Sequence, residues 1–138
     1  MNIDQALISY LLGTSNLTQY VSTKGVFKNL IPQGQDLPVV CFTRISAPRE
    51  HTMLHDPKIY SPHYQFEMYS TSQSQLGSIV KALTSALEDY SGVMGGTSGV
   101  NVQRIFLESD GIDYTDIDPV TNQITFKKIS DFIIWHTT

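Results

Sequence analysis

Apolar residues recur at helical spacing in two stretches of the chain, and each stretch predicts a helix. The first covers residues 2–12, where Asn2 is placed to cap the first turn and Gly13 to end the helix. The second covers residues 73–90 and follows Ser72, which begins a capping-box pattern. Its apolar stripe consists of Leu76, Ile79, Val80, Leu83, Leu87 and Tyr90.

Alternating apolar and polar residues, rich in β-branched and aromatic side chains, predict five strands. They cover residues 26–31, 38–47, 63–70, 100–109 and 124–138. The strand at 38–47 begins with apolar residues on both faces, which is typical of a strand that is covered on two sides. The last strand loses its alternation between Lys128 and Asp131, where we expect a β-bulge.

The predicted elements follow the order α-β-β-β-α-β-β. An apolar helix stripe must be buried against another layer, so this order predicts an α+β fold, with a largely antiparallel sheet of about five strands packed against two helices. We find no repeat or boundary and expect a single domain over residues 1–138. Two connections stand out, a long loop at 47–62 and an acidic loop at 108–122.

Composition narrows the possible functions. Of the 138 residues, 41% are hydrophobic and only 16% are charged, a low charge content that favours burial of surface between subunits. A net charge of −4 with nine basic residues argues against tight binding to nucleic acid. The single cysteine excludes an internal disulfide, and no apolar run is long enough to span a membrane. We therefore expect a soluble protein made in the cytoplasm.

Cys41 is the one candidate nucleophile of a small cysteine-dependent hydrolase. A catalytic thiolate needs a base, and the candidates are His51, His55, His63 and His136. Cys41 lies in the apolar stretch "VVCF" instead of a loop or a helix start. This placement favours a buried packing residue.

Motifs for metals and cofactors are incomplete. His51 and His55 have the spacing of a zinc site on a helix, but the Glu of the hydrolase motif is missing and prolines flank the segment closely. The spacing of the acidic residues does not match a calcium loop; these are Glu108, Asp110, Asp113, Asp116 and Asp118. The glycine-rich stretch at 92–99 leads into a strand, unlike a phosphate-binding loop. We expect no enzyme activity, metal or cofactor.

The order of elements resembles the tail-completion, or tail-terminator, proteins of tailed phages, also called head-tail joining proteins. The resemblance rests on the helix ending at Gly13, the turn "IPQGQDLP" before "VVCFTRIS", the strand "YQFEMYS" and the helical stretch "TSQSQLGSIVKALTSALEDY". It extends from about Ile3 to Trp135.

The resemblance implies a virion structural protein. Such proteins form a closed ring, commonly a hexamer, at the head-proximal end of the tail tube, where they end tube elongation and join the tail to the head. The implied partners are further copies of the chain, the tail-tube protein and a head-completion or connector protein. DNA would pass through the ring without specific binding. A generic α+β oligomerisation or binding domain is the other alternative to an enzyme.

Two surfaces are candidates for these roles. The long loop is more apolar than solvent exposure favours, and we expect a subunit or partner interface at Arg49, His51, Met53, Leu54, Ile59 and Tyr60. The acidic loop would face the channel and repel passing DNA with Asp110, Asp113, Asp116 and Asp118.

Overall fold

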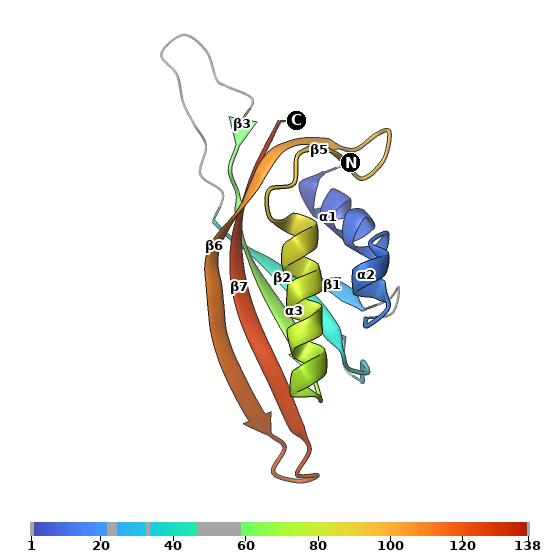
Figure 1. Cartoon of the computed structure of the whole chain (residues 1–138), viewed down its shortest axis with the longest axis vertical. Helices are drawn as coiled ribbons and strands as arrows, with labels where there is room; N and C mark the ends of the chain where they lie inside the picture. The colour runs from blue at the N-terminus through green and yellow to red at the C-terminus, as the bar shows by residue number, and fades with distance from the viewer. Residues whose placement is uncertain (1, 22–24, 33, 47–58, 138) are drawn as a thin grey trace.

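The computed structural model describes residues 2–21, 25–32, 34–46 and 59–137, except for the side chains of two residues, 110 and 112. The elements in chain order are α1 (Ile3–Leu12), α2 (Ser15–Thr18), β1 (Val26–Lys28), β2 (Val39–Ser46), β3 (Ile59–Tyr60), β4 (His63–Ser70), α3 (Gln73–Leu87), β5 (Gly92–Met94), β6 (Val100–Ile117) and β7 (Ile124–Thr137). The helices lie on one face of a curled sheet, as Figure 1 shows. None of the helices among these residues is long and apolar enough to cross a membrane.

The sheet has the strand order β1-β2-β4-β7-β6-β5, and the short β3 also pairs with β7. Every pairing is antiparallel except that of β1 with β2, which is parallel. The predicted α+β class with a largely antiparallel sheet is therefore confirmed. The described residues form seven strands and three helices, where the sequence pattern predicted about five strands and two helices.

Both predicted helices form, and their ends follow from local chemistry. In α1, the Asn2 side chain accepts a hydrogen bond from the Gln5 backbone N–H and the Gln5 side chain accepts one from the Asn2 N–H. This reciprocal pair is a capping box, and it satisfies two backbone donors of the first turn. In α3, the Ser72 hydroxyl caps the Gln75 N–H. The helix ends at Leu87, three residues before the predicted end.

The core lies between the helices and the inner face of the sheet. Leu7 and Leu11 of α1 and Ile79 and Leu83 of α3 are fully buried there. The sheet supplies Phe42, Tyr64, Phe66, Met68, Phe132 and Ile134. Side chains on alternate positions of β4 reach this core, because successive side chains of a strand point to opposite faces.

The predicted loops are shorter in the structure. Glu108 to Ile117 belong to β6, so the acidic stretch is mostly strand and only the connection to β7 is a turn. At the end of the other predicted loop, Ile59 and Tyr60 form β3. Acidic residues are poor strand formers, but here pairing with β7, which places Asp113 opposite Lys128, overrides that preference.

The predicted bulge in the last strand is wrong. β7 pairs with β4 in one unbroken register, from Ile133 opposite His63 to Phe126 opposite Ser70. The irregularities lie in the neighbouring strand β6, where the register shifts between Leu107 and Ser109 and again between Ser109 and Ile112. Gly111 lies in this bulge with a φ of 83°, and a Cβ there would overlap the Ile129 backbone, so only glycine fits.

Candidate functional site

The β6–β7 hairpin extends beyond the rest of the sheet. β4 ends with Ser70 opposite Phe126, whereas β6 and β7 stay paired as far as Ile117 and Ile124. We call residues 113–126, the distal part of this hairpin, the arm; Figure 1 shows its tip reaching past α3. In its turn, the Val120 N–H donates a 2.9 Å hydrogen bond to the Asp118 carboxylate, and this bond lowers the pKa of Asp118.

The arm exposes apolar side chains. Of the eight large apolar residues that are exposed in the described part of the chain, four lie on the arm: Tyr114, Ile117, Val120 and Ile124. Val120 has an exposed fraction of 88%. Asp113, Asp116 and Asp118 lie between them in the sequence. Exposed apolar residues that gather in one segment often mark a contact surface, so the arm is a candidate docking surface.

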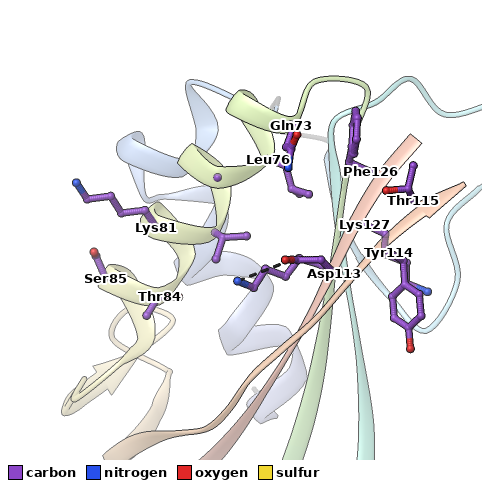
Figure 2. A pocket seen from close by; sticks show the side chains of 13 residues that line it. Gln73, Leu76, Lys81, Thr84, Ser85, Asp113, Tyr114, Thr115, Phe126 and Lys127 are labelled. Atoms are coloured by element: carbon purple, nitrogen blue, oxygen red, sulfur yellow. Dashed lines mark ion pairs between the residues drawn. The ribbon is translucent and has the colours of Figure 1, made fainter. Parts of the chain in front are cut away.

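A cleft of about 510 Å³ separates α3 from the base of the arm. Figure 2 shows that α3 lines one side and the β6 and β7 strands the other. Leu76, Val80 and Phe126 supply the apolar part of its lining. Within it, the Lys128 Nζ lies 4.0 Å from an Asp113 carboxylate oxygen, a distant pairing for an acid whose side chain is 82% exposed. The cleft is thus amphipathic and open to solvent.

On the opposite face of the sheet, Lys127 lies between two aromatic rings. Its Nζ is 5.3 Å from the centroid of the Tyr69 ring and 5.6 Å from that of Tyr114, within cation–π range. The Glu67 carboxylate accepts a 2.6 Å hydrogen bond from the Tyr69 hydroxyl and lies 3.7 Å from Lys127. Burial raises the pKa of Tyr69, and the Glu67 carboxylate adds to the rise. These contacts attach the arm to the strands beside it.

Cys41 lies on β2 directly opposite Glu67 and is buried. Burial raises the pKa of its thiol, and the negative charge of Glu67 raises it further. The thiol is therefore protonated at neutral pH, the reverse of what a nucleophile requires. His63 pairs with Ser46 at the other end of β2, so it does not flank Cys41. The structure argues against the hydrolase and favours the packing role for Cys41.

A buried polar cluster joins α1 to the sheet. The Asp4 carboxylate receives a 2.5 Å hydrogen bond from the Tyr64 hydroxyl and lies 2.6 Å from the Lys28 Nζ and 3.4 Å from an Arg44 nitrogen. Burial alone would raise the pKa of Asp4, but the bonds from Lys28 and Tyr64 and the Arg44 charge together lower it. This cluster was not predicted; its one signal in the sequence is an acid, Asp4, among the apolar positions of a helix.

The expected interface residues are only partly covered by the structure. Arg49, His51, Met53 and Leu54 lie outside the described residues. Ile59 and Tyr60 form β3 and pair with Thr137 and His136 of β7. The Tyr60 and His136 rings stack with their centroids 5.4 Å apart. Both β3 residues are half-buried against their own chain.

The expected channel acids do not form one cluster. Asp110, Asp113 and Asp116 lie along β6 and Asp118 in the turn of the arm. Asp113 lies opposite Lys128 and Asp116 opposite Thr125, and the alternation of the strand sends their side chains to opposite faces. In the part of the chain that the structure describes, no group of three or more His, Cys, Asp or Glu residues could hold a metal ion.

The curled sheet with helices on one face, the exposed apolar residues of the arm and the amphipathic cleft favour a protein with surfaces for contact with other molecules. The fold is similar to a chain in a solved structure described as the virion of a native gene transfer agent particle, with a TM-score of 0.69. The similarity covers 97% of this chain and 94% of that one at 8% sequence identity.

The profile of the tail completion protein gp17 family matches residues 5–127. The chain belongs to this family, and it is a structural tail completion protein of a phage-like virion. No curated protein matches it in sequence. The resemblance seen in the sequence is confirmed, and membership of a structural family implies a non-enzymatic role.

Proposed function

We propose that the chain forms a closed ring, a hexamer, at the head-proximal end of the tail tube, where it ends tube elongation and joins the tail to the head. The family match over residues 5–127 is the observation that carries this proposal. The ring contacts itself, the tail-tube protein and a head-completion or connector protein. The similarity in fold to a chain of a gene transfer agent virion supports a place among other virion proteins.

The distribution of exposed apolar residues supports a ring. A closed ring needs a heterologous contact, in which one patch meets a different patch on the next copy. The arm supplies one patch at the β6–β7 side of the sheet. Leu30 and Ile45, which are 77% and 52% exposed, lie beside β1 and on β2 toward the opposite edge. Two separate patches on one chain suit a head-to-tail arrangement.

The long loop contributes to the contact between copies in this proposal, through Arg49, His51, Met53, Leu54, Ile59 and Tyr60. Deleting residues 49–57 tests this role and retains β3. Size-exclusion chromatography with light scattering should show a smaller oligomer for the deletion variant. An unchanged oligomer at every concentration would remove the loop from the contact.

The acidic residues of β6 and of the turn face the channel in this proposal and repel DNA during its passage. Replacing Asp110, Asp113, Asp116 and Asp118 with Asn removes that charge. We expect slower or incomplete DNA ejection from assembled particles, because DNA would adhere to a neutral channel. Normal ejection would contradict the channel role.

Electron microscopy of particles made without this protein tests the function itself. Over-long tails are expected if the ring ends tube elongation, and separate filled heads and tails if it joins them. Complete particles of normal tail length would contradict both roles. Re-supplying the purified protein to the defective particles is the control, because it should restore joining.

A further inference from the structure

No contact or backbone conformation among the described residues requires a glycine at position 77. It lies within α3, where glycine is less favourable than alanine because of its backbone freedom. A Cβ at this position would meet no atom of the described residues within 4 Å, so there is room for a side chain there. Gly77 also lines the cleft. A close approach from outside the chain is the remaining structural use for it.

The cleft has both apolar and basic side chains that a bound segment could contact. Leu76, Val80 and Phe126 line it beside Gly77. Within the described part of the chain, the one acidic partner of Lys128 is the distant Asp113. Lys81 stands at the rim, and among the described residues it forms no ion pair. An occupant with one apolar side chain and one acid would complement this lining.

The connection between β1 and β2 has this chemistry. Asn29 adopts a left-handed conformation with a φ of 68°, and the Leu30 N–H turns back to donate a 2.8 Å hydrogen bond to the Lys28 carbonyl oxygen. This tight turn directs the Leu30 side chain into solvent. Asp36 is the one charged residue of the connection, is exposed, and has no ion pair within the described part of the chain.

A chain cannot place this connection in its own cleft. β1 is three strands from β7 in the sheet order, which corresponds to about 14 Å at the usual strand spacing. In Figure 1, the cyan connection and the first turn of α3, next to the cleft, lie at a similar height along the long axis of the molecule. A neighbouring copy displaced sideways could bring the two together.

We infer that the cleft receives the β1–β2 connection of a second copy, with Leu30 packed over Gly77 and the apolar lining and Asp36 directed at Lys128. This inference rests on the proposed ring and specifies one of its contacts. The contact is heterologous, because the connection and the cleft are different surfaces of the chain. Repeated around the ring, it would leave every connection and every cleft occupied.

Gly77→Gln tests the space that the contact needs. The substitution should raise the Tm of the isolated chain, because Gln is a better helix former and its Cβ has free space among the described residues. It should weaken self-association by about tenfold or more in Kd, since its side chain fills the cleft. Ser74→Gln, at an exposed position of the same helix that does not line the cleft, is the matched control. Equal association of the two variants would overturn the inference.

A cysteine pair tests the identity of the occupant. In a Cys41→Ala background, chains with Leu30→Cys are mixed with chains carrying Val80→Cys and oxidised, both in solution and in assembled particles. The expected product is a disulfide-linked pair of the two variants. Val93→Cys, at an exposed site on β5, replaces Val80→Cys in the control and should give no such product.

The results of these experiments distinguish a failure of this contact from a failure of the proposed ring. Self-association without the Leu30–Val80 cross-link would overturn the contact and leave the ring standing. A cross-link from Val80→Cys to a different virion protein would show that another partner occupies the cleft, which also overturns the inference. A chain that stays monomeric in solution and gives no linked pair in particles would overturn the proposed ring as well.

Discussion

The strands β6 and β7 run through both the body of the molecule and the arm, but their side chains have different environments in the two regions. In the body, the inner face of β7 is buried under the helices, as Phe132 and Ile134 show. In the arm, the same strand leaves the helices, and Ile124 is exposed with its partner Ile117. Burial inside the chain therefore explains the apolar residues of the body, whereas those of the arm would be buried only by contact with another molecule.

The largest effect should follow from opening a cavity in the body. Phe66→Ala removes a fully buried ring that contacts Phe42 and Phe132, with ring centroids 5.5 and 5.4 Å away. We expect a loss of about 3–5 kcal/mol in the free energy of unfolding. Tyr114→Ala, an aromatic truncation on the arm, is the matched control. Urea denaturation measures both, and comparable losses would abolish the distinction between the regions.

The Asp4 cluster should give the next largest effect. Asp4→Ala leaves Lys28 and Arg44 without their shared carboxylate and Tyr64 without its acceptor. The lysine and arginine side chains are each 40% exposed, so water compensates part of the loss. We expect about 1–3 kcal/mol of destabilisation. A free energy of unfolding equal to that of the wild type would show that the cluster does not hold α1.

The same cluster predicts a pH dependence. The folded pKa of Asp4 lies below its ordinary value of 3.8, so the unfolded chain binds the proton more readily. The stabilisation is present above the unfolded pKa and is lost as the pH falls through the lower folded pKa. Urea midpoints measured across the acid range should therefore fall more steeply for the wild type than for Asp4→Asn. Parallel curves would contradict this assignment.

Gly77→Ala should raise the free energy of unfolding, unlike the substitutions above. The added methyl group has free space and reduces the freedom of the unfolded chain, so we expect stabilisation of up to about 1 kcal/mol. Thermal unfolding of the isolated chain measures the gain. A destabilised Gly77→Ala chain would show that the chain itself uses this glycine.

The smallest effect on folding should come from the arm. Ile117→Asn and Val120→Asn replace side chains that are 56% and 88% exposed. Their free energy of unfolding should stay within about 0.5 kcal/mol of the wild type. Incorporation of each variant into particles, measured by gel densitometry, should nevertheless fall. Full incorporation of both would mean that the arm's apolar residues do not dock.

Local signals in the sequence predicted part of the fold well. The Asn2–Gln5 capping box and the apolar stripe of α3 are visible because their residues lie within a few positions of each other. The full length of β6 was not predictable from its acidic residues. It depends on pairing with β7, including Asp113 opposite Lys128, which only the folded hairpin brings together.

The candidate site was less predictable, because its parts are distant in sequence. Asp4 accepts a hydrogen bond from Tyr64, sixty positions away, and no local sequence pattern predicts such a pair. The cleft joins α3 to the arm, and Gly77 becomes informative only once the empty space beside it is known. Exposed apolar residues in the arm resemble core residues of a strand in the sequence, so their exposure also required the structure.

Amide hydrogen exchange, compared between the free chain and the chain in assembled particles, can show whether the arm and the cleft are covered on assembly. We expect assembly to slow exchange in the arm and in α3 around Gly77, and to leave exchange in the already buried strand β4 unchanged. Equal exchange of the arm and α3 in the free and assembled states would contradict the claim that these surfaces are used in assembly.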